Sequence, residues 1–272
     1  MTEPALAADP ALADRVTLDV ADGLARLTLA RVQGRNGIDM AMVLALAAVL
    51  DTVAADPGVR ALLIDADGPA FTVGGDLRHL GGQADRLPTE LHEMISRYHR
   101  TLGQLAELPI PVLVAAHGAA AGGGLGLLWC ADVVIAADDL RIATGFVHLA
   151  LSGDGGSSWH LPRLVGLRRA QELIMGGRVL DAAEALDWGL VTRVVPAAEL
   201  VEQALAQARA LAAGPTYAIG RMKRLLLESS GHGYAEQLAA ERDAIVDCAR
   251  TGDAREGLAA FAARRPPRFA GR

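Results

Sequence analysis

The sequence of 272 residues predicts an α/β fold that ends in a helical region. Three observations support this prediction. A hairpin pattern opens the chain, short apolar runs then alternate with helical patterns, and almost only helical patterns follow Gly166. Strands that appear as continuous apolar runs between helices are typical of sheets that are covered on both faces.

The first elements are a hairpin, a helix and a buried strand. Apolar residues alternate over 16–20 and 24–29, and the Asp22-Gly23 pair between them is a strong hairpin signal. The Ala/Leu/Val-rich segment Met40 to Ala55 predicts a helix, which an Asp-Pro-Gly sequence ends. The apolar run Val59 to Ile64 predicts a buried strand.

The same alternation recurs in the middle of the chain. We expect strands at Pro111 to Ala115 and Val133 to Ala136, with a helix at Gly122 to Cys130 between them. The segment Arg78 to Arg97 lacks clear periodicity, and we expect it to be a mobile wall of a binding pocket.

The C-terminal part is predicted to contain six helices and the strand Val191 to Val195. The helices are expected at Arg168 to Met175, Asp181 to Leu186, Ala198 to Ala212, Tyr217 to Ser229, Tyr234 to Arg250 and Asp253 to Ala263. The helices at 198–212 and 234–250 carry more apolar surface than one buried face needs, which indicates a homo-oligomer.

Composition excludes several classes of protein. The 26 Lys and Arg residues against 32 Asp and Glu give a net charge of −6, and the cations are spread out, so nucleic acid is not an expected partner. Cys130 and Cys248 form neither a disulfide framework nor a metal-binding spacing. The N-terminus does not resemble a signal peptide, and charged and glycine residues interrupt the most apolar stretch. We therefore expect a cytoplasmic protein without a membrane span.

Three glycine-rich segments are candidates for chemistry. Phe71 to Leu77 follows a strand, and its glycines leave N–H groups open to a ligand, although a plain tight turn is the alternative. Ala115 to Gly126 leads from a strand into a helix whose first N–H groups favour an anion, although close helix packing is equally compatible. Leu151 to Arg163 places Asp154 before a helix, as a functional acid or as a helix N-cap.

Together these segments resemble the crotonase superfamily, the enoyl-CoA hydratase and isomerase group. Four segments agree in order along nearly the whole chain: Phe71 to Leu77, Gly118 to Leu127, Gly153 to Arg163 and Ala182 to Val191. The resemblance implies a spiral of ββα repeats over residues 1–200, which holds the site for a CoA ester, and a helical trimerisation region over 201–272. It also implies an acyl-CoA thioester substrate, a homo-trimer or hexamer, and no metal or cofactor beyond the coenzyme A of the substrate.

The resemblance assigns the catalytic groups. The N–H groups of Gly75 and Gly123 form an oxyanion hole for a thioester enolate, and donors aimed at developing charge fit this role. The other residues placed at the substrate are Arg35, Gly37, Ile38, Val73, Gly74, Asp76, Leu77, Gly118, Gly122, Phe146 and Leu149.

Two details of this assignment concern coenzyme A and the loop of the first segment. Gly37 and Ile38 are expected to face the pantetheine and adenine, and Arg31 or Arg35 to meet the phosphates. Asp76 is also expected to anchor its loop.

The sequence departs from the hydratases at two carboxylates. Where the resemblance expects glutamates that activate a water, the chain has Gly126 and Phe146, or Gly145 if the gap moves by one residue. Asp154 remains, and in relatives similar to phenylacetyl-CoA ring-epoxide isomerases an acid at this position shuttles a proton. One carboxylate suffices for a 1,3-proton shift, and an apolar pocket would raise its pKa.

The leading interpretation is therefore an acyl-CoA isomerase. An enoyl-CoA hydratase and a non-catalytic protein that binds CoA esters are the alternatives. His117, His148 and His160 rank below Asp154 as candidate bases.

Overall fold

The computed structural model describes residues 14–76 and 86–271. Its main sheet has six strands in the order β1-β2-β3-β5-β7-β10, and only the first pair is antiparallel. The strands are β1 (Val16–Ala21), β2 (Leu24–Leu29), β3 (Ala61–Ala66), β5 (Val112–Ala116), β7 (Val133–Ala137) and β10 (Arg193–Val195). The α/β class and the opening hairpin are confirmed.

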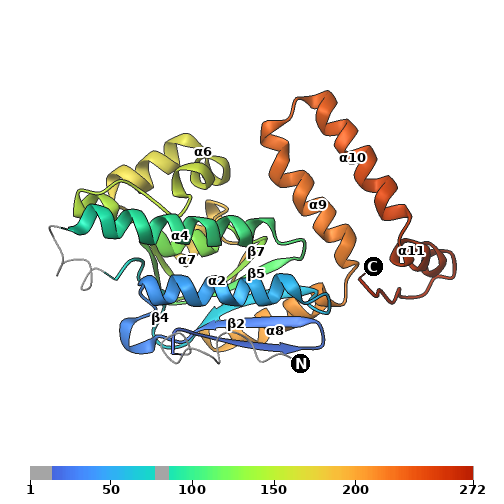
Figure 1. The fold of residues 1–272 in the computed structure, drawn as a ribbon, viewed down its shortest axis with the longest axis horizontal. Helices are drawn as coiled ribbons and strands as arrows, with labels where there is room; N and C mark the ends of the chain where they lie inside the picture. The colour runs from blue at the N-terminus through green and yellow to red at the C-terminus, as the bar shows by residue number, and fades with distance from the viewer. Residues whose placement is uncertain (1–13, 77–85, 272) are drawn as a thin grey trace.

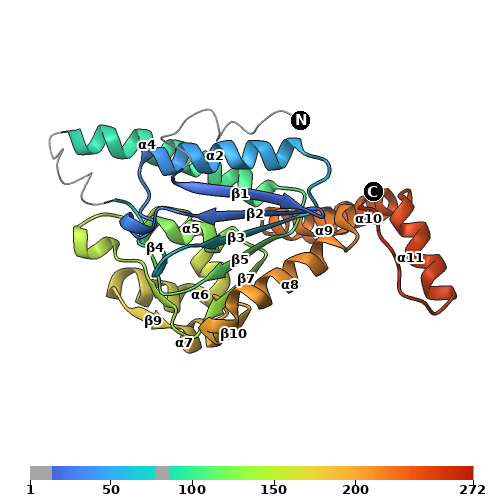
Figure 2. The same ribbon diagram turned by 90° about the horizontal axis from the view of Figure 1, so that it is seen from below.

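Helices cover both faces of this sheet. Figure 2 shows α2 (Met40–Ala55) and α4 (Leu87–Glu107) on one side and α8 (Leu200–Ala212) on the other. Small residues of α8, such as Ala204 and Ala208, are fully buried against Leu63 and Ile135 of the strands. The apolar surface of α8 is thus covered by the sheet of the same chain. The boundary expected after residue 200 would separate this sheet from α8, one of the helices that cover it.

A second sheet stands beside the first and holds the candidate site. It has the order β4-β6-β8-β9, with β4 (Ala70–Thr72), β6 (Ala119–Ala121), β8 (Arg141–Ala143) and β9 (Val179–Asp181). Each of β4, β6 and β8 follows a longer strand of the main sheet almost directly, as β6 follows β5. The chain therefore bends from one sheet into the other, and the glycine-rich segments lie where these short strands end.

Further helical segments lie between the strands and after the last one. The segments are η2 (Val32–Gly34), η4 (Gly122–Gly124), α5 (Leu125–Trp129), η5 (Phe146–Leu149), α6 (Ser157–Gly176), α7 (Ala182–Asp187) and η6 (Ala197–Glu199). The helix α6 contains a break at Gly166, where φ is 76° and ψ is 159°. The expected helix at 168–175 is therefore the second half of a longer element.

The last helices leave the core. Figure 1 shows α9 (Thr216–Glu228), α10 (Tyr234–Ala249) and α11 (Gly252–Ala262) as an arm beside the rest of the molecule, with η7 (Ser229–Gly231) at its tip. We call these residues, 216–262, the C-terminal arm. Lys223 ties its root to the core, because Nζ lies 2.9 Å from Asp132 Oδ2. None of the helices in the described residues is long and apolar enough to cross a membrane.

One expectation about the fold is wrong in part. Residues 87–97, taken from the sequence as an aperiodic, mobile wall of a pocket, belong to the regular 21-residue helix α4, although Leu91, Met94 and Ile95 do line a cavity. Residues 78–85 lie outside the described residues. Apolar side chains recur on one face of α4 at Met94, Tyr98, Leu102 and Leu105, and all four are buried. These apolar residues are spaced by three and four positions, as on one helix face, but the polar residues between them make the segment look irregular in composition.

Candidate active site

Two glycine-containing loops meet at the carboxyl ends of β4 and β6. Gly74 has φ of +80°, and a Cβ there would lie 2.8 Å from the Ala121 carbonyl oxygen. A Cβ on Gly124 would lie 2.4 Å from Thr72 Cγ2. Gly74 therefore touches the backbone at Ala121, and Gly124 touches the Thr72 side chain, so a residue larger than glycine would clash at either position.

The Gly75 N–H is free to bind a ligand. Its loop forms a parallel bridge to Ile38, in which Ile38 N donates to Gly74 O at 2.7 Å and Asp76 N donates to Ile38 O at 2.9 Å. In a parallel bridge the residue between these two groups directs its own N–H to the opposite side. Gly75 lines a cavity on that side.

The Gly123 N–H is free for a different reason. Gly122–Gly124 form a 3₁₀-helix with Ala121 as N-cap, and bonds in such a helix run between residues three apart. The amides of Gly122 and Gly123 thus have no carbonyl partner inside the helix. Both glycines line the same cavity as Gly75. The pair of N–H donors predicted from the sequence is present at one cavity wall.

Asp154 lies directly on this glycine helix. A Cβ on Gly123 would be 2.5 Å from Asp154 Oδ1 and 2.9 Å from Oδ2. Gly155, with φ of +60°, packs in the same way, because its Cβ would lie 2.5 Å from Gly123 O. We call the residues Gly153–Gly156 the acid loop; it meets the glycine helix through the Asp154 carboxyl and through the backbone of Gly155.

The environment of Asp154 favours a proton acceptor over a helix cap. The N-cap of α6 is Gly156, with no side-chain capping bond, so the N-cap alternative for Asp154 is wrong. Asp154 Oδ1 is buried and has no hydrogen-bond partner among the described residues. Burial raises the pKa of the Asp154 carboxyl. A carboxylate that is poorly solvated in this way is a stronger base than an exposed one.

The cavity has a volume of about 460 Å³ and apolar walls. From α4 come Leu91, Met94 and Ile95, and from the segment after β8 come Phe146, Leu149 and Leu151. Of the predicted site residues, the cavity brings together Val73, Gly75, Gly122, Gly123, Phe146, Leu149 and Asp154. The two amides and the one carboxyl thus face a space suited to an apolar group.

Other predicted residues lie elsewhere. The Ile38 side chain is 4 % exposed and belongs to the core, so the expectation that it faces a ligand is wrong. Gly118 packs on Pro69, and its N–H donates to Asp139, so it supports the turn into β6 and lies outside the cavity wall. Leu77 lies outside the described residues.

The segment around Gly37 holds the loop Val73–Asp76, which we call the first glycine loop. Arg31 donates to Gly37 O at 2.8 Å and to Asp76 Oδ2 at 2.6 Å. Asp76 thus anchors its loop, as expected, and Arg31 is engaged within the protein. Arg35, at the end of η2, is exposed, and of these two arginines it is the one open to an anion.

Sequence reasoning missed a histidine in this cavity. His99 lines it from α4, and its Nε2 accepts a hydrogen bond from Gly155 N at 3.2 Å. The signal that could have found it is the spacing of four from Leu91 to Ile95 to His99, which puts all three on one helix face. Of the histidines ranked below Asp154, His148 lines the cavity, whereas His117 binds Gly68 O.

A carboxylate side chain has no room at Gly126, which lies in α5 directly after the glycine helix. A Cβ on Gly126 would lie 2.6 Å from Leu102 Cδ1 and 2.8 Å from Gly155 O. Within the described residues, no cluster of three His, Cys, Asp or Glu side chains is placed to hold a metal ion. Among the described residues, the site therefore combines one carboxyl, two backbone donors, the rings of His99 and His148, and largely apolar walls.

Comparison with known proteins agrees with this geometry. Residues 19–272 match the family model described as enoyl-CoA hydratase/isomerase. The chain is 35% identical over 254 residues to the 1,2-epoxyphenylacetyl-CoA isomerase of Escherichia coli, covering 93% of this chain and 97% of that protein. It is 31% identical to the trans-2-decenoyl-[acyl-carrier-protein] isomerase of Streptococcus mutans, covering 94% and 98%. The crystal structure of an enoyl-CoA hydratase from Polaromonas sp. JS666 has a TM-score of 0.89 and 31% identity, covering 93% and 99%.

Proposed function

The chain belongs to the enoyl-CoA hydratase/isomerase family, and from this premise we propose that it isomerises an acyl-CoA thioester with Asp154 as the proton shuttle. The observation that supports this most directly is the position of the lone, partly buried carboxyl against the oxyanion glycine Gly123. Two relatives are named as isomerases, one of an epoxyphenylacetyl-CoA and one of a decenoyl thioester.

The chemistry needs one group that removes and returns a proton. The ionised Asp154 takes a proton from a carbon of the acyl chain, which leaves the electron pair in the enolate of the thioester. The N–H groups of Gly75 and Gly123 hold the enolate oxygen, and removal of one such donor costs about 2.7–4 kcal/mol in acyl chemistry. Asp154 then returns the proton two carbons away, so the double bond moves. No atom or electron is gained or lost, and no cofactor beyond the substrate's own coenzyme A is needed.

Ordinary hydration fits the site less well. Activation of a water by two carboxylates requires a second acid beside Asp154, and at Gly126 the Leu102 side chain and the Gly155 carbonyl fill that space. The second position is occupied by Phe146, which is 8 % exposed. Among the described residues that line the cavity, Asp154 is the one carboxylate, so the paired-carboxylate arrangement is absent there.

The substitution Asp154→Asn tests the proposal, because asparagine keeps the shape and loses the base. We expect isomerisation of a 3-enoyl-CoA and exchange of its α-proton with deuterated water to fall at least about a thousandfold, a typical share of acid-base catalysis. The affinity for the acyl-CoA, measured by calorimetry, should change less than about threefold. Unchanged turnover in the variant would make Asp154 structural. Hydration of crotonyl-CoA by the wild type would favour the hydratase.

The position of the coenzyme A part of the substrate is proposed in less detail. We place the pantetheine and nucleotide along the outer side of the first glycine loop, near Gly37, where Arg35 is exposed and offers charge-assisted hydrogen bonds to phosphate. Since Arg31 is held by Asp76, Arg35→Gln is the informative change. It should raise the KM for the CoA ester and leave kcat unaltered, with Arg60→Gln as a control that removes a cation bonded within the protein.

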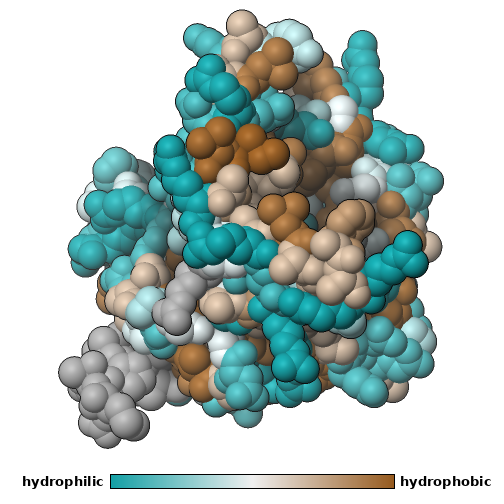
Figure 3. All heavy atoms as spheres, turned by 90° about the vertical axis from the view of Figure 1, so that its right-hand side faces the viewer, coloured by the Kyte–Doolittle hydropathy of each residue, from teal (hydrophilic) through white to brown (hydrophobic). Residues whose placement is uncertain are grey.

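We further propose a homo-trimer or hexamer assembled through the C-terminal arm. Figure 3 shows apolar side chains gathered on the side of the molecule where the arm lies, around a hollow. Exposed apolar residues of the arm are Met222, Leu226, Tyr234, Leu238, Ile245, Val246, Leu258 and Phe261. Only Ala244 of α10 is buried, so most of this helix lacks a covering surface within the chain.

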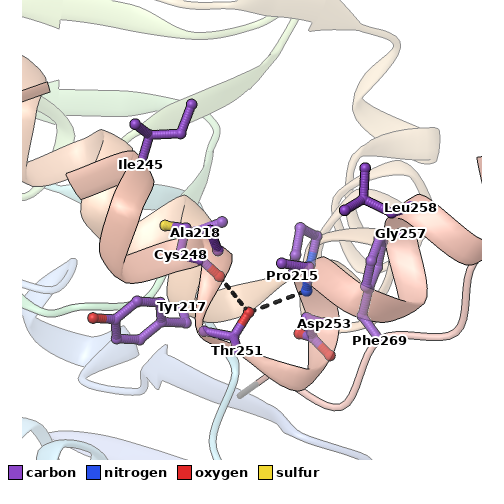
Figure 4. Close-up of a pocket in the computed structure, with 12 residues that line it drawn as sticks. Pro215, Tyr217, Ala218, Ile245, Cys248, Thr251, Asp253, Gly257, Leu258 and Phe269 are labelled. Carbon is purple, nitrogen blue, oxygen red and sulfur yellow. Dashed lines mark hydrogen bonds between the residues drawn. The ribbon is translucent and has the colours of Figure 1, made fainter. Parts of the chain in front are cut away.

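A cavity of about 410 Å³ lies between the arm helices. Figure 4 shows Ile245, Leu258 and Phe269 around it. Thr251 donates to the Cys248 carbonyl and accepts from Ala254 N, and this second bond caps the N-terminus of α11. A second copy would fill this cavity with its own apolar side chains. Light scattering of Ile245→Asp should show a smaller species than the wild type, whereas a wild type that is itself monomeric would contradict the proposal. The cytoplasmic location stays a prediction.

A further inference from the structure

Two consecutive residues of α4 reach the two backbone segments that hold the proposed reaction centre. Tyr98 Oη donates to Gly123 O at 3.1 Å. His99 Nε2 accepts from Gly155 N at 3.2 Å. One segment carries the oxyanion donor and the other carries Asp154, and Gly155 follows the acid directly. Neither bond is needed to form α4, since both link it to other parts of the chain.

The acid loop has little else to hold it at this point. Gly153, Gly155 and Gly156 give it no side chains, and Gly155 and Gly156 have φ of +60° and +76°. Among the described residues, its other backbone bonds lie at its end, where Ser157 N donates to Asp154 O, and Trp159 N and His160 N donate to Gly156 O. A loop of glycines costs more conformational entropy to fix than any other, so a bond to its backbone has a large effect on its order.

The chemistry of both α4 side chains suits this task. Tyr98 is 3 % exposed, and burial raises the pKa of its phenol well above the usual range, so it stays a donor. His99 offers a ring nitrogen, Nε2, that can accept the Gly155 N–H.

The same helix contacts the space for the acyl group. Met94 lies four residues before Tyr98, and Ile95 lies four residues before His99, and both line the cavity. A group that fills the cavity would thus press on the helix that carries both bonds.

We propose that Tyr98 and His99 form a two-point clamp that fixes the Asp154 carboxyl on Gly123. They are positioning residues, because each acts through a backbone group of the acid loop or the glycine helix. The inference rests on the proposed function only for its effect on rate. The clamp itself is a claim about how well the acid loop is ordered.

The rate arm of the test uses Tyr98→Phe, His99→Leu and His99→Gln with a 3-enoyl-CoA. Loss of either bond should lower kcat about tenfold and change KM less than about twofold, because misplacement of the acid affects the reaction step more than binding. Glutamine places an amide oxygen near the position of Nε2, so His99→Gln should recover kcat to within about threefold of wild type. The double variant with Tyr98→Phe and His99→Leu should lose less than the product of the single losses.

The matched control is Arg100→Leu, on the next residue of α4. Arg100 is exposed and faces the groove beside Leu44 and Ala47, so kcat and KM should remain those of the wild type. If His99→Leu behaves like this control, the clamp is refuted. If His99→Gln is as slow as His99→Leu, the ring itself transfers protons and positioning is refuted.

Amide hydrogen exchange separates the clamp from the proposed reaction. Exchange in the peptide that covers 151–157 should be faster in His99→Leu than in wild type and normal in His99→Gln. This readout needs no turnover. A wild type without isomerase activity but with this exchange pattern would refute the proposed function and keep the clamp, whereas unchanged exchange in His99→Leu would refute the clamp.

Discussion

Replacing Gly155 with alanine tests whether the acid loop must lie directly on the glycine helix. The added Cβ would stand 2.5 Å from Gly123 O, where ordinary contact begins near 3.4 Å, so the two segments must separate by about 0.9 Å. The φ of +60° adds about 1–2 kcal/mol of strain for an L-residue. Overpacking adds about 1–3 kcal/mol. The sum is roughly 2–5 kcal/mol, and at about 2–4 °C per kcal/mol the Tm should fall at least about 4 °C.

The effect on rate should be larger than the effect on folding. A shift of about 1 Å in a catalytic group costs roughly a hundredfold in rate, so we expect kcat for a 3-enoyl-CoA to fall by about that factor in Gly155→Ala. Assays should be run well below the Tm of the variant, with circular dichroism confirming that it is folded. A variant that keeps wild-type kcat would show that Asp154 need not contact Gly123.

Gly153→Ala is the matched control on the same loop. A Cβ at Gly153 would lie 3.5 Å from the Phe146 ring, which is ordinary contact, and its φ is not positive. We therefore expect Tm within about 2 °C and kcat within about threefold of wild type, by the usual size of neutral substitutions. Equal damage from both substitutions would mean that the loop tolerates no side chain anywhere, and the argument from contact at Gly155 would fail.

Three further changes follow from the same geometry. Because burial raises the pKa of Asp154 in the folded protein, the charged carboxylate destabilises the fold at neutral pH. Asp154→Asn removes this charge and should therefore raise the Tm at neutral pH. The gain should disappear below pH about 3.9, where Asp154 is protonated in both the folded and the unfolded state. For the same reason kcat/KM of the wild type should fall as pH drops through a value above the ordinary carboxyl range. Gly126→Glu should not confer hydration of crotonyl-CoA and should lower Tm, because Leu102 and the Gly155 carbonyl occupy the space. Arg31→Leu should lower kcat about tenfold by removing one of the contacts that hold the Gly75 loop, whereas Arg97→Leu, which removes an exposed ion pair, should change kcat and Tm little.

The long regular elements could be predicted from the sequence because local patterns determine them. The hairpin at 16–29 and the helix Met40–Ala55 appear where the Asp-Gly turn and the Ala/Leu pattern place them. The short strands β4, β6, β8 and β9 were not predicted. Three residues such as Ala119–Ala121 are too few to show a period, and their pairing depends on partners distant in the chain.

The site was partly predictable for a related reason. The free N–H groups of Gly75 and Gly123 follow from glycines after strands, a pattern that can be seen locally, and the structure supplies the bridge and helix start that free them. Tyr98 and His99 could not be found in this way, because they reach the site from a helix whose period is hidden by polar residues. The burial of Ile38 likewise depends on the bridge to the Gly75 loop, which sequence spacing does not reveal.

The direct contact between the glycine helix and the acid loop also determines where this enzyme can evolve. At Gly74, Gly124 and Gly155 any substitution displaces the neighbouring chain, so these positions cannot encode a preference between acyl groups. The variable part of recognition must then come from the side chains that α4 and η5 present to the cavity, such as Leu91, Ile95 and Leu149. A library for new substrates should randomise those positions and leave the glycines unchanged, because selectivity and reactivity are encoded by separate sets of residues in this molecule.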